Sequence, residues 1–212
     1  MAETKLIIFD LDGTLVDAYG AITRSFNDTM ARLGLERRSV GAIRKAVGWG
    51  DESLLKPFVG RGRLKEALAF YRLHHKQALL SYSRVYPHVR RVLGELKKRG
   101  IKLAIASNRP TRFSLILVRH LKLDGLLDYI LCADRLRYAK PHPQILRKIM
   151  KKFRVLPAQT SYVGDMAIDA ECARRAGVRA FIVTTGSSSR KEIKKERPYR
   201  IMRDTKELLK AL

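Results

Sequence analysis

Two aspartates separated by one residue follow a short apolar run near the start of the chain. The run covers residues 6–9 of KLIIFDLDGTLVD, and the aspartates are Asp10 and Asp12. Positions i and i+2 of an extended segment share a face, so both carboxylates can point at one spot. Two such charges in a partly dry cleft repel each other unless a cation neutralises them or one binds a proton. Because Mg²⁺ favours carboxylate oxygens, the pair predicts a magnesium site.

The residues directly after the pair, Gly13 and Thr14, fit a phosphate-binding turn. Gly13 allows the backbone to approach an anion closely, and the amides that follow can cradle phosphate oxygens. Asp-Gly is also a common turn pair, and D-x-D resembles the opening of a calcium loop. The calcium interpretation fails because no third acidic ligand or terminal Glu follows at the required spacing. A turn alone explains Gly13 but not the paired carboxylates.

Polar residues also follow three later segments that resemble strands. Ser107 and Asn108 come after KLAIA and can hydrogen-bond an anion. Lys140, in YAKPHP, precedes a helix that starts with proline, where the amino end favours negative charge. Asp165 and Asp169 lie in GDMAID, about one helical turn apart. Since ligands of open parallel sheets bind at the carboxyl ends of the strands, these residues are expected to meet Asp10 and Asp12.

The elements that would position these residues alternate between strand and helix from residue 85 onward. Short apolar runs, rich in Ile, Leu, Val and Ala, predict strands in a parallel sheet covered on both faces. With residues 5–9, the predicted strands are 102–107, 129–132, 161–164 and 180–185. Helices are predicted near 88–99, 111–121, 143–153 and 168–176. This alternation predicts a doubly wound, Rossmann-like α/β sheet of at least five strands.

Residues 17–84 break this alternation and predict a helical insertion without a strand. The predicted helices cover 19–33, 39–47, 51–58 and 63–80. We therefore expect an α/β core formed by residues 1–16 and 85–212, with residues 17–84 as a small α-helical cap domain inserted between the first two strands of the sheet.

These motifs resemble those of the haloacid dehalogenase-like hydrolase superfamily, specifically its phosphatase branch with a helical cap. The matching segments, in the family's order, are FDLDGTLVD (9–17), ASN (106–108), KPHP (140–143) and GDMAID (164–169). The resemblance covers nearly the whole chain. It is strongest to members like phosphoglycolate phosphatase and β-phosphoglucomutase, whose cap lies between the first two motifs.

The resemblance implies a role for each aspartate of the first motif. Asp10 would be the nucleophile that attacks phosphorus and forms an aspartyl-phosphate. Asp12 would protonate the leaving oxygen and later activate water, while its backbone carbonyl helps to bind Mg²⁺. Because the dehalogenase subgroup lacks an aspartate at the second position, Asp12 favours phosphate chemistry over carbon–halogen cleavage.

The later motifs carry the remaining implied roles. Ser107 and Lys140 would hold the phosphoryl oxygens, with Lys140 also restraining Asp10. Asp165 would complete the metal site. Asp169 would act as a ligand through water or orient Lys140.

The cap segment RKAVGWGDESLLK (44–56) offers candidate substrate contacts. Arg44 and Lys45 could meet a second anionic group, and Trp49 between two glycines could form a mobile lid. The competing interpretation is that Trp49 packs between cap helices and the cations are solvated. His74 and His75 lie in a helical run without metal-ligand partners and are expected to be structural or exposed.

The composition is globular but strongly basic, with a net charge of +24 from 44 basic and 20 acidic residues. Such a charge raises the hypothesis of nucleic-acid binding. The basic residues recur on helix-like segments such as 90–100, 147–154 and 190–200, separated by apolar residues, which is typical of solvated helix faces. Attraction of anionic substrates, or adaptation of the organism's proteome, is an equally open explanation.

Neither a membrane-spanning segment nor a signal peptide is expected, and the two cysteines, Cys132 and Cys172, lie in apolar patterns without metal-ligand spacing. Buried thiols in a reducing cytoplasm are the expectation.

The predicted function is that of a Mg²⁺-dependent phosphatase, acting on a small cytosolic phosphomonoester. A sugar-phosphate mutase, or a basic nucleic-acid-binding module with a secondary phosphatase site, are the alternatives.

Overall fold

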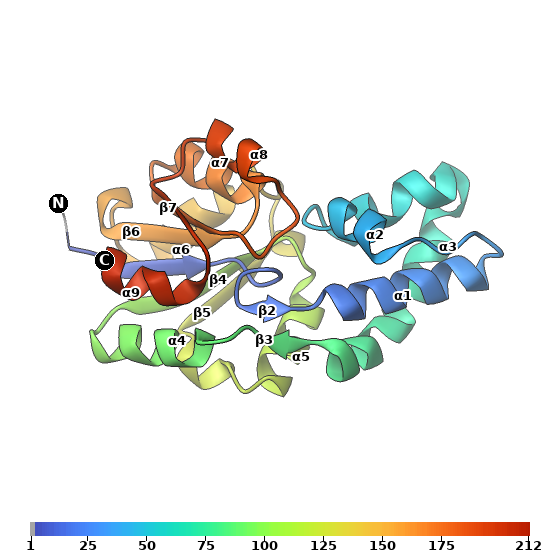
Figure 1. Ribbon diagram of the computed structural model, residues 1–212, viewed down its shortest axis with the longest axis horizontal. Helices are drawn as coiled ribbons and strands as arrows, with labels where there is room; N and C mark the ends of the chain where they lie inside the picture. The colour runs from blue at the N-terminus through green and yellow to red at the C-terminus, as the bar shows by residue number, and fades with distance from the viewer. Residues whose placement is uncertain (1–2) are drawn as a thin grey trace.

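A six-stranded parallel sheet forms the centre of the molecule (Figure 1). The computed structural model describes residues 3–212, the side chain of residue 61 aside. The strand order is β5-β4-β1-β6-β7-β8, and every neighbouring pair is parallel. The strands are β1 (Leu6–Phe9), β4 (Lys102–Ser107), β5 (Tyr129–Cys132), β6 (Thr160–Gly164), β7 (Arg179–Val183) and β8 (Arg200–Met202).

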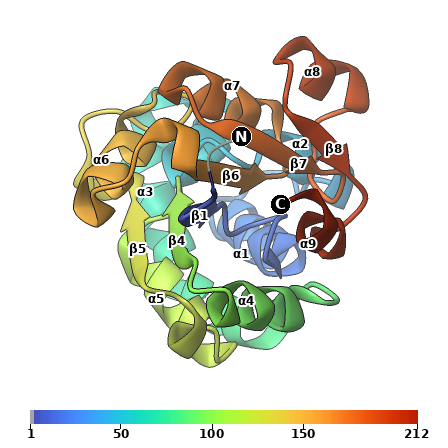
Figure 2. The same ribbon diagram turned by 90° about the vertical axis from the view of Figure 1, so that its left-hand side faces the viewer.

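Helices cover both faces of this sheet, as Figure 2 shows along its edge. Successive strand side chains alternate between the two faces, so β1 contributes Ile7 and Phe9 to one apolar cluster and Leu6 and Ile8 to another. The first face carries α4 (Val89–Lys98), α5 (Thr111–His120) and α9 (Leu208–Ala211); the second carries α6 (Gln144–Phe153), α7 (Ala167–Ala176) and α8 (Arg190–Lys195). Short 3₁₀ turns lie at Asp124–Leu126, Ala133–Arg135, Pro157–Gln159 and Thr205–Glu207.

The region between residues 17 and 84 is helical and lies beyond one end of the sheet (Figure 1). It consists of α1 (Tyr19–Arg32), α2 (Val40–Ala46) and α3 (Asp51–Tyr82). Gly60, at φ 71° and ψ 169°, interrupts α3, at the break that the sequence predicts between two helices. Two short antiparallel strands, β2 (Val16–Asp17) and β3 (Arg84–Val85), join this region to the sheet.

The predicted fold class is confirmed, and two details differ from the sequence analysis. The basic stretch 190–200 has a helix-like pattern, but the helix α8 ends at Lys195. The strand β8, which is not predicted from the sequence, begins at Arg200. The paired strands β2 and β3 are only two residues long each, too short to leave a pattern in the sequence. The division into core and cap at 16/17 and 84/85 stays a prediction.

The exposed basic faces of the helices agree with their predicted amphipathic character. In α8, Ile193 is buried while the four basic residues are exposed, and α6 buries Ile145, Leu146, Ile149 and Met150. Within residues 3–212, no helix combines the length and the apolar character needed to cross a membrane.

Candidate active site

Three buried aspartates converge at the carboxyl end of the sheet. Asp10 follows β1, Asp165 follows the neighbouring strand β6, and Asp169 lies in the first turn of α7. One carboxylate oxygen from each lies within 4.8 Å of the others. These three residues can therefore hold a metal ion.

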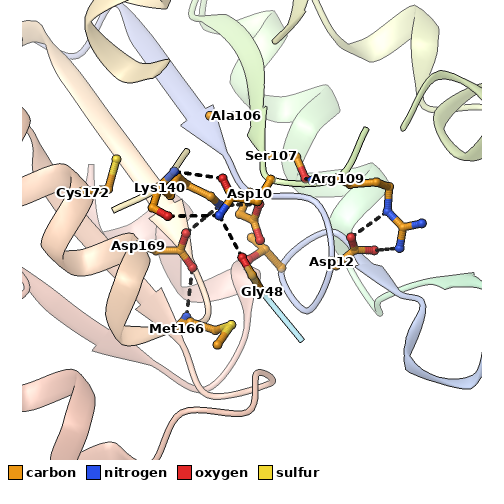
Figure 3. Close-up of polar contacts among 12 residues, drawn as sticks. Asp10, Asp12, Gly48, Ala106, Ser107, Arg109, Lys140, Met166, Asp169 and Cys172 are labelled. Carbon is orange, nitrogen blue, oxygen red and sulfur yellow. Dashed lines mark hydrogen bonds and ion pairs between the residues drawn. The ribbon is translucent and has the colours of Figure 1, made fainter. Parts of the chain in front are cut away.

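The ammonium of Lys140 lies beside this cluster (Figure 3). Its Nζ is 2.7 Å from Oδ1 of Asp10, 2.8 Å from Oδ1 of Asp169 and 3.0 Å from the hydroxyl of Tyr162. Lys140 is only 3% exposed. Burial alone would lower the pKa of Lys140, but the two carboxylates outweigh it and the pKa is raised, so the ammonium persists. We call Lys140, Asp10, Asp169 and Tyr162 the Lys140 cluster.

Asp169 is fully engaged as a positioning group. Its Oδ1 accepts hydrogen bonds from Lys140 and from Tyr162, the latter at 2.9 Å. Its Oδ2 accepts from the backbone N–H groups of Asp165 at 3.2 Å and Met166 at 3.0 Å, which satisfies the start of α7. Because all its acceptor sites face donors, Asp169 fits an orienting role better than that of a direct metal ligand.

Asp165 lies in a negative and dry environment. Thr14 Oγ1 donates to its Oδ1 at 2.9 Å, and the Tyr19 hydroxyl from α1 lies 3.5 Å from its Oδ2. Burial, followed by the charges of Asp169 and Asp10, holds the pKa of Asp165 well above its usual range. A buried carboxylate with this surplus of negative charge fits a divalent cation.

Burial and neighbouring negative charges also raise the pKa of Asp10, but less strongly than that of Asp165. Burial is the main cause that raises its pKa to about 7 from 3.8, against the opposing charge of Lys140. The adjacent Gly13 has φ 84°, and a Cβ there would lie 2.2 Å from Oδ2 of Asp165. Only glycine permits this approach, so the turn after β1 packs tightly on the candidate metal ligand.

A second set of buried polar residues surrounds the guanidinium of Arg109. Its Nε and Nη2 donate to the two carboxylate oxygens of Asp12 at 2.8 and 2.7 Å (Figure 3). Its Nη1 lies 2.7 Å from Nε2 of His75 in α3, and Nδ1 of that ring lies 2.9 Å from Oγ of Ser25 in α1. We call Arg109, Asp12, His75 and Ser25 the Arg109 cluster.

The tautomer of His75 follows from these partners. A guanidinium can only donate, so Nε2 must accept and the proton lies on Nδ1, which donates to Ser25. Burial, with the nearby charge of Arg109, lowers the pKa of His75 to about 2. The ring is therefore neutral at any physiological pH.

The two residues predicted at the end of β4 both line the pocket. The Ser107 hydroxyl accepts from the backbone N–H of Arg109 at 3.2 Å. Asn108 bonds both the backbone N–H and the carbonyl of Lys140, and its amide also donates to the Gly48 carbonyl at 2.9 Å. Asn108 therefore joins the second and third motifs to the helical region.

Residues of both clusters line one pocket. Its volume, as space for the centres of water molecules, is about 50 Å³, enough for only a few waters. Asp10, Asp12, Ser107, Asn108, Arg109, Lys140 and Asp169 line it from the sheet side. The opposite wall is mostly apolar and comes from Ile22, Val47, Gly48, Gly50, Asp51, Leu54 and Tyr71, with Met166 and Ile168.

The substrate contacts predicted in the helical region do not lie at this pocket. Arg44 donates to the carbonyls of Thr185 at 2.5 Å and Gly186 at 3.3 Å, and its guanidinium lies over the Tyr19 ring. Lys45 is exposed, and Trp49 is 47% exposed. Arg44 therefore holds α2 against the core, and the pocket wall uses neighbours of Trp49 instead.

Thr14 and Gly13, predicted beside a phosphate, are placed around Asp165, so their observed contacts support the candidate metal ligand.

Four residues of the two clusters, Arg109, Tyr162, His75 and Ser25, were not identified as site residues from the sequence. Arg109 directly follows Ser107 and Asn108, so its position after a strand was an available signal. Tyr162 lies two positions before the GDMAID motif, inside a segment whose apolar pattern predicts a strand. His75, predicted to be structural or exposed, is buried against Arg109, and nothing in its helical pattern distinguishes it from His74.

Known proteins resemble this chain in sequence and in fold. A family model described as haloacid dehalogenase-like hydrolase matches residues 7–183. A phosphoglycolate phosphatase of Mannheimia succiniciproducens is 33% identical over 100% of this chain and 99% of its own, and one from Pseudomonas syringae pv. tomato is 31% identical over 97% and 78%. The crystal structure of a predicted phosphoglycolate phosphatase from Haemophilus somnus superposes with a TM-score of 0.93, at 28% identity, covering 100% and 99% of the two chains. The chain therefore belongs to the haloacid dehalogenase-like hydrolases and is a phosphatase of that family.

Proposed function

We propose that this phosphatase uses Mg²⁺ and hydrolyses a small phosphomonoester through a phosphorylated Asp10. One observation carries the proposal: the Asp10 carboxylate lines the pocket with Oδ1 on Lys140 at 2.7 Å. Its Oδ2 makes no hydrogen bond to any of the described residues, so an acceptor oxygen stays available for chemistry.

The steps follow from the placement of these groups. An Asp10 oxygen attacks phosphorus while the bond to the ester oxygen breaks, and Asp12, once released from Arg109 and protonated, gives its proton to that leaving oxygen. Asp12, now a carboxylate, then takes a proton from a water that attacks phosphorus. The bond to Asp10 breaks, and inorganic phosphate leaves with Asp10 regenerated.

Lys140 and the carboxylate cluster determine the charge balance of these steps. The ammonium offsets negative charge that develops on the phosphoryl oxygens and keeps Asp10 oriented. The Asp10 and Asp165 carboxylates and the Asp12 carbonyl would hold Mg²⁺. Bound there, the ion would neutralise the carboxylates and the entering phosphate dianion.

Phosphoglycolate is the first substrate to test. The curated relatives named above are phosphoglycolate phosphatases, and the mostly apolar wall opposite the sheet side offers few partners to a hydroxylated sugar. No observation favours the nucleic-acid alternative, and a mutase differs by rearranging a sugar phosphate with little release of phosphate.

The test compares phosphate release from phosphoglycolate and from an aryl phosphate, with Mg²⁺ and after its removal by a chelator. Asp10→Asn is expected to lower release by more than about 1,000-fold while thermal unfolding shows a folded protein. Asp124→Asn, at an exposed position outside the pocket, is the matched control and should retain turnover. Turnover by Asp10→Asn, or metal-independent turnover by the unaltered protein, would refute the proposal.

A further inference from the structure

Arg109 is a second buried cation in the pocket, and the chemical steps above do not use it. The residue is 7% exposed and follows β4 directly. Of its five side-chain N–H bonds, the hydrogen bonds to Asp12 and His75 use three. The other two have no acceptor among the described residues. A buried guanidinium with free donors beside a cavity is suited to binding an anion.

His75 fixes the guanidinium from the side of the helical region. Its ring stacks on Tyr71 at 4.6 Å and meets Phe113 edge-on at 4.9 Å, so α3 and α5 hold it from two directions. Ser25 determines the ring's rotation through its bond to Nδ1. The acceptor Nε2 therefore has one orientation, and that orientation sets the plane of the Arg109 fork.

The ion pair between Arg109 and Asp12 in this structure prevents Asp12 from acting as the proton donor of the proposed reaction. Both carboxylate oxygens are held by the guanidinium, so Asp12 cannot turn toward a leaving oxygen above Asp10 until this pair opens. Opening it without a replacement takes the hydrogen-bonded counter-ion from a buried guanidinium and leaves only the weaker attraction of Asp51, which is unfavourable. A substrate that brings its own negative group removes that cost by taking the place of Asp12.

We propose, resting on the proposed function, that Arg109 is a specificity residue that binds a carboxylate of the substrate and thereby frees Asp12, with His75 as its positioning residue. A guanidinium fork matches the two oxygens of a planar carboxylate. In this structure the fork already holds the planar carboxylate of Asp12, so a substrate carboxylate fits the same place. The apolar wall of the pocket offers little to a hydroxylated sugar. The substrate class is thus a short phosphorylated acid.

Three esters with the same two-carbon skeleton test this assignment. They are 2-phosphoglycolate, which has a carboxylate, ethylene glycol bisphosphate, which has a second phosphate, and ethyl phosphate, which has neither. The measured quantity is the ratio of kcat/KM values between esters, with Mg²⁺ present. The unaltered enzyme should prefer phosphoglycolate to both of the others. Fastest hydrolysis of the bisphosphate would overturn the carboxylate assignment.

Variants of Arg109 then attribute the preference to this residue. Arg109→Met should reduce the preference for phosphoglycolate over ethyl phosphate by about 10- to 100-fold, the range expected for hydrogen bonds to a charged group. Arg109→Lys keeps the positive charge but lacks the bidentate guanidinium, so its preference for phosphoglycolate should lie between those of the unaltered enzyme and Arg109→Met. It also tests the assignment if Arg109→Met does not fold. Arg119→Met removes an exposed cation of α5 and should leave the ratio unchanged.

Variants of His75 test its positioning role. His75→Phe keeps an aromatic ring between Tyr71 and Phe113 but removes the acceptor, so the preference should fall by about 10-fold. His75→Gln has an amide oxygen that can accept from Arg109 and should restore part of the preference. A purely structural role would lower kcat/KM for all esters alike.

The outcomes separate this inference from the proposed function. If the unaltered enzyme releases no phosphate from any ester, the proposed function fails. If it hydrolyses ethyl phosphate and phosphoglycolate equally well, or if Arg109→Met preserves the preference, only the assignment of Arg109 is overturned.

Discussion

The Lys140 cluster and the Arg109 cluster both contribute side chains to one pocket but are built differently. Every member of the first comes from the core: Asp10 follows β1, Lys140 lies in the loop before α6, Tyr162 lies in β6 and Asp169 lies in the first turn of α7. The second takes Arg109 and Asp12 from the core but His75 and Ser25 from α3 and α1. The comparison indicates that the reacting centre is complete without the helical region, whereas the orientation of the second cation depends on it.

Removal of the Lys140 ammonium is expected to have the largest effect on activity and stability. Lys140→Met leaves Asp10 and Asp169 buried without their cation, so unfolding free energy should fall by about 3 kcal/mol. Activity toward every ester should fall by about 100-fold or more, because the lost charge faces the phosphoryl group. Denaturant unfolding and phosphate-release assays measure the two effects. A loss confined to carboxylated substrates would contradict the division between the clusters.

A smaller effect is expected from the pH dependence of stability at His75. Its pKa is lowered to about 2 from 6.5, so the unfolded chain binds a proton near pH 6.5 that the folded protein excludes. Stability contributed by the neutral ring is therefore complete above pH 6.5 and is lost as the pH falls. From pH 7 to pH 5 this loss amounts to about 2 kcal/mol.

His75→Gln cannot bind that proton and isolates the effect. Unfolding free energies of the two proteins at pH 7 and pH 5 give the difference, in which other titrating groups cancel. An equal pH dependence in both proteins would show that His75 is not held neutral by burial and Arg109, and would remove the basis for a fixed Arg109 fork.

The same contrast explains how much could be predicted from the sequence. Asp10, Asp12, Lys140, Asp165 and Asp169 each lie next to the end of a strand or the start of a helix, so local patterns mark them. Topology then brings them together, because carboxyl ends of parallel strands share an edge.

No local sequence pattern identifies the residues of the helical region that contact the site. His75 meets Arg109 across 34 positions of the sequence, and the packing of α3 on α5 decides it. Arg44 has a charge suited to a substrate anion, but the carbonyls of Thr185 and Gly186 bind it instead. Helical periodicity predicts which face of a helix is buried, but not which residue of another element it meets.

The most direct test of the account is to find the phosphorylated residue. Enzyme quenched during turnover of phosphoglycolate with Mg²⁺ is treated with borohydride, which reduces an acyl phosphate to an alcohol, and the peptides are mapped by mass spectrometry. The account predicts that Asp10 alone is converted to homoserine, in a substrate-dependent manner. Conversion at another carboxylate, or turnover with no residue converted, would contradict it.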